Sequence, residues 1–366
     1  MSEPVFIVGG GPAGMALALA LHRGGVASRI VDARPRGAAQ SDARILALSH
    51  GSRLSLEMLG VWQDIPHQPI TTIHVSHQGG LGRTLMRAAE ENVPALGYVL
   101  AAGDLAAALD QAVTAAGIAY QDNTPAPEQA VALLTVHAEG RIEDSENIRT
   151  HDYGQHAVIC MASAATPHRG TAWERFTPAG PVALLPLSCQ GGDEYAIVLT
   201  CPAAASEEIA ALDDSRFRAL LQERFGPRVK LMGVGPRRVY PLGLRVRRQP
   251  VGDRAVWIGN AAQTLHPVAG QGFNLALRDI MELADTLTDA NGAIDPGDPA
   301  LLARYAARRR LDRAGTIGFT DGLVRLFSNA IPPLLHVRGA GLLALDLFPP
   351  ARSFLARRMM FGARGW

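Results

Sequence analysis

The chain has 366 residues, which suits two domains or one domain with a large insertion, and its 48% hydrophobic residues can bury a full core. Its formal net charge of +1 argues against a nucleic-acid-binding protein that works by bulk positive charge. The 3 cysteines, Cys160, Cys189 and Cys201, lack C-x-x-C spacing, so we expect no disulfide framework and no zinc site, and free thiols fit a reducing cytosol.

A strand, a glycine turn and a helix are predicted at the start of the chain. Residues 4–8 form an apolar run typical of a buried strand, a helix is expected over 12–23, and a second strand over 28–31 ends at Asp32. The glycines of the intervening G-x-G-x-x-G pattern are Gly9, Gly11 and Gly14. This order matches the dinucleotide-binding fingerprint in its required context, with glycines that let the pyrophosphate approach and an acid that accepts hydrogen bonds from the adenosine ribose.

Short elements are expected up to about residue 150. They are a helix over 49–59, a strand over 70–78, a helix over 105–116 with Asp104 as its N-cap, and a strand over 131–136. Arg44 is a candidate phosphate or flavin contact, although the residues alone favour a solvated surface arginine. His74 and His77 lie three apart on a predicted strand and so point to opposite faces, which makes them a poor metal chelate.

The middle of the chain changes character. Strand-like runs at 157–161, 182–185 and 195–199, with a helical run at 217–225, predict an antiparallel sheet with a helix that forms a separate, substrate-facing layer. Tyr240 follows this layer and is a candidate neighbour of the substrate, although a core tyrosine beside a proline turn is the more ordinary interpretation.

A second glycine stretch follows at residues 255–279. A short apolar strand ends at Gly259, and a loop that carries His266 leads into a helix that begins near Phe273. The other candidate residues of this loop are Asn260, Pro267, Gly270, Gln271 and Gly272. Glycines at a helix N-terminus let the backbone approach a flat or anionic ligand, but the spacing alone equally allows an ordinary strand-to-helix connection.

The C-terminal part is arginine-rich and helical. A helix is expected over 301–318, and residues 322–366 hold six arginines, one acid and many apolar pairs. One interpretation is a set of helices packed on the nucleotide domain; the other is a basic, apolar surface that meets a membrane or a partner protein. No apolar run reaches the roughly 18–20 residues of a spanning helix, so we expect a cytoplasmic protein with at most peripheral contact at the inner face of the membrane.

The two glycine stretches together resemble those of the single-component FAD-dependent aromatic hydroxylases of the para-hydroxybenzoate hydroxylase type, and within them the ubiquinone-biosynthesis hydroxylases. The resemblance covers nearly the full length, and Asn260, where most relatives have aspartate, is typical of that subgroup. The segments that carry it, besides the glycine stretches, are 44–49, 73–76, Glu174-Arg175-Phe176-Thr177, Tyr240-Pro241-Leu242, Thr316-Ile317-Gly318 and Thr320-Asp321.

The resemblance implies an α/β fold with a Rossmann-like FAD-binding domain, an inserted antiparallel-sheet substrate domain and a helical C-terminal segment. The expected FAD-binding parts are 1–75, 99–150 and 241–290, the substrate-binding parts 76–98 and 151–240, and the C-terminal segment 291–366. The expected cofactor contacts are Gly9, Gly11 and Gly14 on the pyrophosphate, Asp32 on the ribose, Arg44 along the FAD, Asn260 on the ribityl chain or phosphates, Pro267 by the flavin ring, and Gly270, Gln271, Gly272, Phe273 and Asn274 at its pyrimidine edge.

The resemblance also implies a reaction. NAD(P)H binds transiently and reduces FAD, dioxygen adds to give a flavin C4a-hydroperoxide, and its terminal oxygen attacks a polyprenylated phenol of the 2-polyprenyl-6-methoxyphenol type. No residue is identified as a catalytic base.

One departure from the family pattern leaves an alternative open. Relatives carry an Asp-Gly motif where this chain has Glu139-Gly140 in a shortened segment. The alternative is therefore a non-catalytic flavin-binding scaffold subunit of a quinone-synthesis complex. An NAD-dependent dehydrogenase would leave the second glycine stretch without a role.

Overall fold

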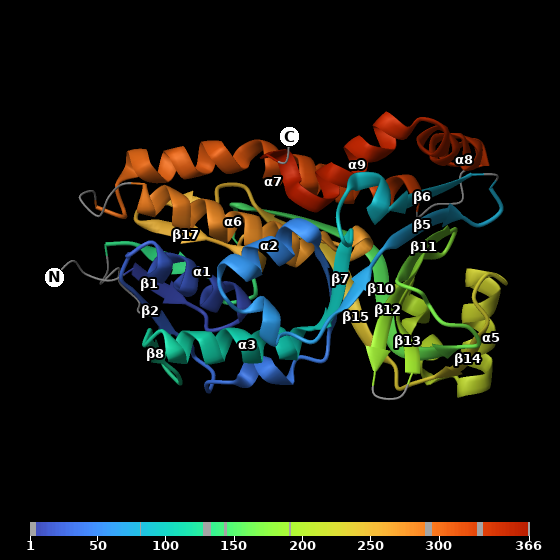
Figure 1. The fold of residues 1–366 in the computed structure, drawn as a ribbon, viewed down its shortest axis with the longest axis horizontal. Coiled ribbons are helices and arrows are strands. Elements are labelled where there is room, and N and C mark those ends of the chain that lie inside the picture. The colour runs from blue at the N-terminus through green and yellow to red at the C-terminus, as the bar shows by residue number, and fades with distance from the viewer. Residues whose placement is uncertain are drawn as a thin grey trace.

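A six-stranded sheet carries the N-terminal half of the fold in the computed structural model, which describes residues 5–80, 82–126, 133–142, 145–189, 192–289, 295–327 and 332–364 (Figure 1). Its strands, in spatial order, are β16 (Val251–Gly252), β17 (Ala255–Trp257), β9 (Thr135–His137), β1 (Val5–Val8), β2 (Ser28–Val31) and β8 (Ala119–Gln121). All pairs are parallel except β16 with β17. The two predicted N-terminal strands are confirmed.

Three helices cover this sheet: α1 (Pro12–Arg23), α3 (Ala102–Ala115) and α6 (Gln271–Thr288). The helix predicted over 12–23 is confirmed, and its inner side packs Leu17 and Leu21 into the core without exposure. The predicted N-cap is wrong, because α3 begins three residues earlier and Ala101 is its N-cap. Asp104 lies instead in the first turn, where its negative charge still complements the helix dipole.

A large second sheet forms the other end of the molecule. Its path is β18 (Gln263–Thr264), β15 (Arg238–Arg247), β10 (Ile148–Ala164), β13 (Gly192–Pro202), β12 (Gly180–Cys189), β11 (Thr171–Thr177), β5 (Thr72–His77) and β6 (Arg83–Arg87), with β14 (Leu231–Val234) on β10. Among the described strand pairs of this sheet, β11 with β5 is the parallel one. The predicted strands at 157–161, 182–185 and 195–199 lie inside β10, β12 and β13, so the antiparallel layer is confirmed.

One face of this second sheet is covered by α4 (Ser206–Ala211) and α5 (Asp214–Phe225). Helix α5 includes the predicted run at 217–225, and its buried Phe217, Leu221 and Phe225 pack on the strands. Cys160 and Cys201 are free thiols buried in this sheet.

A small third sheet joins the two large ones. It contains β3 (Ile45–Ser49), β7 (Gly97–Ala101) and β4 (Gln68–Ile70), and α2 (His50–Met58) follows β3. The strand predicted over 70–78 is divided at Thr71, whose N–H donates to the carbonyl of Gly170, so that β4 belongs to the third sheet and β5 to the second.

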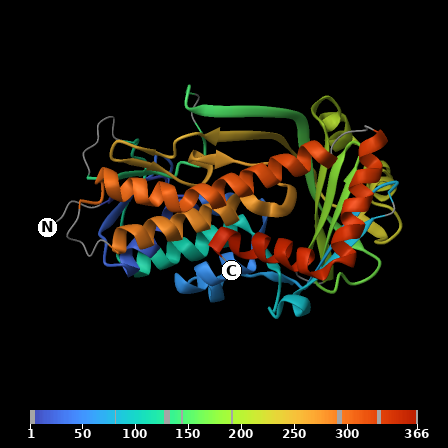
Figure 2. The ribbon, with the colours of Figure 1, turned by 90° about the horizontal axis from the view of Figure 1, so that it is seen from above.

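The C-terminal helices run along one side of both large sheets (Figure 2). They are α7 (Pro299–Phe327), α8 (Pro332–Leu347) and α9 (Pro349–Phe361). Helix α7 continues nine residues past the predicted end at 318, packs on α6, and reaches the second sheet, where α8 contacts β5 and β6. Helix α9 returns to α2. Within the described parts of the chain, none of the helices combines the length and apolarity that a bilayer crossing requires.

Candidate active site

Three loops meet at the carboxyl ends of β1, β9 and β17. A Cβ on Gly9, whose φ is +111°, would lie 2.5 Å from the carbonyl oxygen of Ala138 after β9. A Cβ on Gly259, which follows β17, would lie 3.3 Å from the Cβ atom of Ala13 in α1. The chain therefore brings its N-terminal glycine turn, the segment after β9 and the loop after β17 together where the strand order reverses, which is the ligand-binding position of open parallel sheets.

The glycine turn is closed on its inner side and open on its outer side. A Cβ on Gly14 would lie 1.9 Å from the carbonyl oxygen of Gly9, whereas a Cβ on Gly11 would meet nothing within 4 Å. Gly11 is the N-cap of α1, and Pro12 occupies its first turn. Space in front of a helix N-terminus fits a pyrophosphate, because unpaired N–H groups and the positive end of the dipole face it.

Asp32 ends β2 beside this turn. Its carboxylate accepts hydrogen bonds from the N–H of Gly10 at 2.7 Å and from Arg34, whose N–H lies at 2.8 Å and whose Nη2 lies at 3.2 Å. Burial alone would raise the pKa of Asp32, but these hydrogen bonds outweigh it and hold the pKa below its usual value. Asp32 is therefore ionised at neutral pH, as acceptance from ribose hydroxyls requires.

The segment after β9 contains the altered Glu139-Gly140 pair. The Oε1 atom of Glu139 lies 2.9 Å from Nδ1 of His137, and the His137 ring stacks on Trp257 of β17 at 5.0 Å. The glutamate is therefore held to its own strand, beside the carbonyl that packs against Gly9.

The loop between β17 and α6 has an unusual backbone. Ala269 and Gly270 both adopt left-handed conformations, with φ of +61° and +60°, and a non-glycine residue there costs on the order of 1–2 kcal/mol. A Cβ on Gly270 would lie 3.2 Å from Ala47 of β3, so the loop presses on the third sheet. A Cβ on Gly272 would meet nothing within 4 Å, which leaves the start of α6 open to a ligand.

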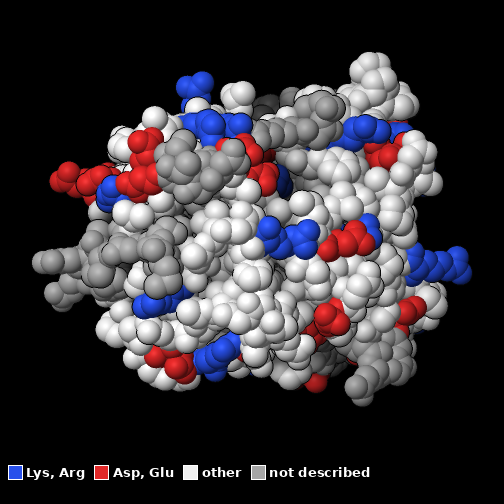
Figure 3. Space-filling view, turned by 60° about the vertical axis from the view of Figure 1, so that its left-hand side comes forward, with Lys and Arg blue, Asp and Glu red and all other residues white. Residues whose placement is uncertain are grey.

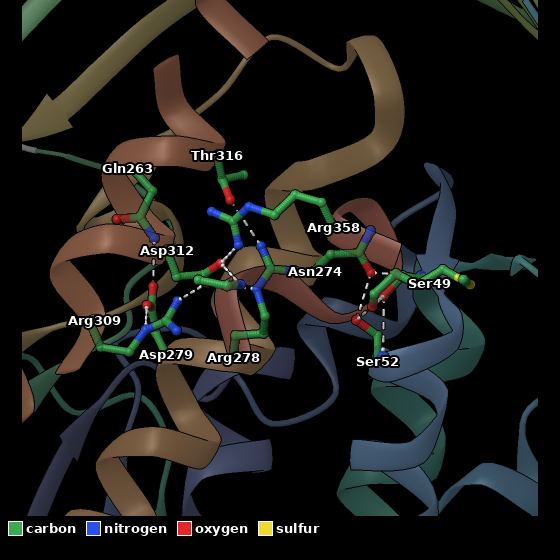
Figure 4. A network of polar contacts seen from close by, with 12 residues as sticks. Ser49, Ser52, Gln263, Asn274, Arg278, Asp279, Arg309, Asp312, Thr316 and Arg358 are labelled. Carbon is green, nitrogen blue, oxygen red and sulfur yellow. Dashed lines mark hydrogen bonds and ion pairs between the residues drawn. The ribbon is translucent and has the colours of Figure 1, made fainter. Parts of the chain in front are cut away.

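Asn274 fixes the start of α6 to its neighbours (Figure 4). Its Nδ2 donates to the carbonyls of Ala47 at 3.0 Å and Gly270 at 2.7 Å. Its Oδ1 accepts from the N–H of Ser49 at 2.8 Å and the hydroxyl of Ser52 at 2.6 Å. The side-chain amide is thus occupied by the protein, and Asn274 contributes to this site by positioning the helix start.

The other loop residues differ in exposure. His266 is buried, its Nδ1 accepts from the N–H of Val268, and burial lowers its pKa to about 4, so it is a neutral anchor. Pro267 is exposed, whereas Gln271 is buried and donates to the carbonyl of Ala269. Asn260 is half-buried, and the described residues provide no hydrogen bond to its side chain.

Arg44 and Tyr240 lie apart from this loop. The guanidinium of Arg44 is half-exposed and binds Asp42, with Nη2 2.6 Å from Oδ2. Hydrogen bonding to Asp42 raises the pKa of Arg44, and the nearby Tyr240 of β15 adds to the rise. Neither residue lines the cavity beneath the C-terminal helices. Tyr240, the candidate neighbour of the substrate, therefore lies outside the wall of that cavity.

A cavity of about 460 Å³ begins at the loop before α6 and extends beneath the C-terminal helices. Its wall includes Val268 and Ala269 from the loop, strands β5, β6 and β11, and the inner sides of α7, α8 and α9. The wall is overwhelmingly apolar, and its charged side chains within the described chain are Glu174 of β11 and Arg338 of α8. The cavity can therefore hold an apolar molecule with one end at the loop.

Glu174 was missed as a site residue by sequence reasoning, which used it only as part of a matching motif. The available signal is its alternation: Ala172, Glu174 and Phe176 share one face of β11, so an acid stands between two buried apolar residues. Burial raises the pKa of Glu174 to about 7.

A network of buried ion pairs supports α6 from behind (Figure 4). Asp312 of α7 accepts from Arg278 Nε at 2.8 Å, from Arg309 Nη2 at 2.7 Å and from Arg358 Nη1 at 2.8 Å. These contacts join α6, α7 and α9. They hold together the helix that follows the cavity loop and two of the helices that cover the cavity.

The face that Figure 3 brings forward carries mixed charge. Among the described residues visible there, basic side chains are scattered among acids and uncharged residues. This agrees with the net charge of +1.

Comparisons with known proteins identify the family of this chain. The family model described as FAD binding domain matches residues 2–150 and 146–317. The ubiquinone hydroxylase UbiL of Rhodospirillum rubrum is 36% identical, with 97% of this chain and 89% of that protein covered. The 3-demethoxyubiquinol 3-hydroxylase of Escherichia coli is 29% identical over 93% of this chain and 94% of its own.

Solved structures share the fold. The p-nitrophenol 4-monooxygenase PnpA of Pseudomonas putida superposes with a TM-score of 0.75 at 16% identity, covering 99% of both chains. The probable FAD-dependent monooxygenase pqsL of Pseudomonas aeruginosa gives 0.72 at 18% identity, covering 94% of this chain and 100% of its own.

Proposed function

The chain belongs to the FAD-binding-domain family of flavoprotein monooxygenases, and from this premise we propose that it hydroxylates the ring of a polyprenylated phenol in ubiquinone biosynthesis. The substrate is of the 2-polyprenyl-6-methoxyphenol type. The observation that carries the proposal is the apolar cavity of about 460 Å³, which runs from the loop before α6 to the C-terminal helices. A phenol ring with the first part of a prenyl chain suits such a wall, whereas a small charged aromatic acid does not.

We propose that FAD lies along the crevice between β1 and β9. Gly9, Gly11 and Gly14 with the N-terminus of α1 would hold the pyrophosphate, and Asp32 the adenosine ribose. Arg44 would lie along the cofactor. The side-chain amide of Asn260, to which the described residues provide no hydrogen bond, suits the ribityl chain or a phosphate. The flavin ring would rest by Pro267, with its pyrimidine edge at Gly270, Gln271, Gly272 and Phe273, where Asn274 fixes the helix start.

The reaction also needs a source of activated oxygen, stabilisation of negative charge and the exclusion of water. Bound FAD, once reduced by NAD(P)H, supplies activated oxygen from dioxygen. The positive end of α6 would stabilise negative charge on the pyrimidine edge of bound FAD, and the apolar wall would exclude water from the reacting ring.

The test begins with the purified protein and added FAD. We expect a bound-flavin spectrum and NAD(P)H oxidation that depends on 2-geranyl-6-methoxyphenol and yields hydroxylated product. A protein that takes up no flavin contradicts the cofactor site. Flavin uptake without turnover favours the non-catalytic scaffold subunit, for which the altered Glu139-Gly140 segment is the motivation.

We also propose that α8 and α9 contact the inner face of the membrane, where a polyprenylated substrate resides. Five large apolar side chains on or beside these helices are 45–74% exposed: Val337, Leu343, Leu347, Phe348 and Phe354. Arg325 and Arg357 form ion pairs with Asp321 and Glu91, and their side chains are still half-exposed, so they can also meet anionic headgroups. Other side chains of the same helices line the cavity, so a prenyl chain would have a short path into it.

Sedimentation with phosphatidylglycerol vesicles tests this contact. We expect the wild type to sediment at low salt and the Leu347→Glu/Phe348→Glu variant to stay in the supernatant. Leu311→Glu is the matched control, because Leu311 is 73% exposed on α7 and should have no effect. A wild type that remains in the supernatant contradicts membrane contact and favours the other use of this surface, association with another quinone-synthesis protein.

A further inference from the structure

Glu174 occupies the cavity wall between the loop before α6 and the C-terminal helices. It lies on β11 in register with Val75 of β5, and on the same face as Phe176, which stacks on Phe327 of α7 with ring centres 4.0 Å apart. Val75, Phe176 and Phe327 also line the cavity. A carboxyl group is thus placed in an apolar wall, where it needs a polar partner.

The part of the protein that the structure describes does not supply that partner. Among the residues that the structure describes, no hydrogen bond or ion pair reaches the side chain of Glu174. The other polar groups in the wall are already engaged: Ser49 and Thr84 donate to carbonyls of α9 and α8, and Gln271 donates within its own loop. Asn274 makes the four contacts described above.

The charged and titratable groups on this side of the sheet leave Glu174 unpaired. Arg338 of α8 lies over the Phe327 ring, with its guanidinium carbon 6.0 Å from the ring centre. His77 of β5 is buried against the same ring, and burial, with the nearby Arg338 and Arg175, lowers its pKa, so it is neutral. Burial raises the pKa of Glu174 to about 7, so the carboxyl can take up or release a proton near neutral pH.

We propose that Glu174 is the catalytic residue that binds the phenol hydroxyl of the substrate and accepts its proton during ring hydroxylation. This inference rests on the proposed function. The phenol O–H bond breaks and its proton passes to the carboxylate, while the electron pair stays on the phenolate oxygen and enriches the ring. The ring carbon forms its new C–O bond with one oxygen atom of dioxygen as the O–O bond breaks; the other oxygen atom leaves as water, and NAD(P)H supplies the two electrons through FAD. The ring carbon then loses its hydrogen as a proton to solvent, and Glu174 returns its proton to the product oxygen.

A binding measurement without turnover isolates this contact. Calorimetry on the oxidised FAD-loaded protein at pH 8 compares 2-geranylphenol with its methyl ether, which has no hydroxyl proton to donate. We expect the wild type to favour the phenol roughly 10- to 100-fold, as for a hydrogen bond to a charged group. Glu174→Leu should reduce this ratio to about 1, and Glu174→Gln, which keeps a neutral acceptor, should give an intermediate ratio.

The pH profile supplies a second measurement. In the wild type kcat/KM should rise with pH through a limb near 7, because the carboxylate is the proton acceptor, and Glu174→Gln should lose that limb. Glu223→Gln is the matched control, since Glu223 is an exposed acid on α5, across the sheet from the cavity. It should keep both the phenol preference and the limb.

Two outcomes overturn the assignment: a phenol-to-ether ratio in Glu174→Leu equal to that of the wild type, or a limb near pH 7 that persists in Glu174→Gln. With either, hydroxylation by the wild type and by Glu223→Gln leaves the proposed function standing. A wild type that binds flavin but neither binds nor hydroxylates the phenol refutes the proposed function itself.

Discussion

A single half-buried acid in the cavity wall sets a pH dependence for the fold. The pKa of Glu174 rises from the usual 4.5 to about 7 because burial disfavours its charged form. Between these values the folded chain holds a proton that the unfolded chain has lost, so the contribution of Glu174 to stability falls as pH rises through this window. The effect is on the order of 3–4 kcal/mol, since each step of one in pKa corresponds to about 1.4 kcal/mol.

We therefore predict that Glu174→Gln raises the free energy of unfolding, relative to the wild type, more at pH 8 than at pH 5. Urea unfolding at the two pH values measures the difference. Glu223→Gln should show no such dependence. An equal effect of Glu174→Gln at both pH values would mean that the carboxyl is ionised and solvated in the folded protein.

At the scale of elements, the junction of α6, α7 and α9 depends on Asp312. It accepts from three arginines and from the N–H of Ala363 at 2.8 Å, and the charges of Arg278 and Arg309 hold its pKa below the usual 3.8 although burial opposes this. Its contribution to stability is therefore present above about pH 4 and is lost on acidification.

We predict that Asp312→Ala lowers the free energy of unfolding at pH 7 by about 3–5 kcal/mol, because buried guanidinium groups lose their partner. Denaturant unfolding measures this, and Arg310→Ala, an exposed change on the same helix, should stay within about 0.5 kcal/mol of the wild type. A loss below about 1 kcal/mol for Asp312→Ala would show that the network does not hold these helices together.

At the scale of the whole molecule, the sequence predicts what local chemistry determines. Gly9, Gly14 and Asp32 are identifiable because their spacing, and the strand and helix around them, lie within one short segment. The antiparallel layer is identifiable because its strands are long apolar runs. For Glu174 the sequence offers only the alternation along its own strand. That Glu174 and Arg338 line one cavity depends on the packing of β11 and α8, because the two residues are 164 positions apart in the sequence. The occupied amide of Asn274 likewise depends on partners in β3 and α2.

Isotope labelling shows most directly whether this molecule uses FAD to place an oxygen atom from dioxygen on a polyprenylated phenol. The FAD-loaded protein is supplied with NAD(P)H, 2-geranyl-6-methoxyphenol and ¹⁸O-labelled dioxygen, and the mass of the product is measured by mass spectrometry. We expect a product that has gained one labelled oxygen atom. Consumption of NAD(P)H with the phenol recovered unchanged, or a product whose new oxygen carries no label, would contradict it.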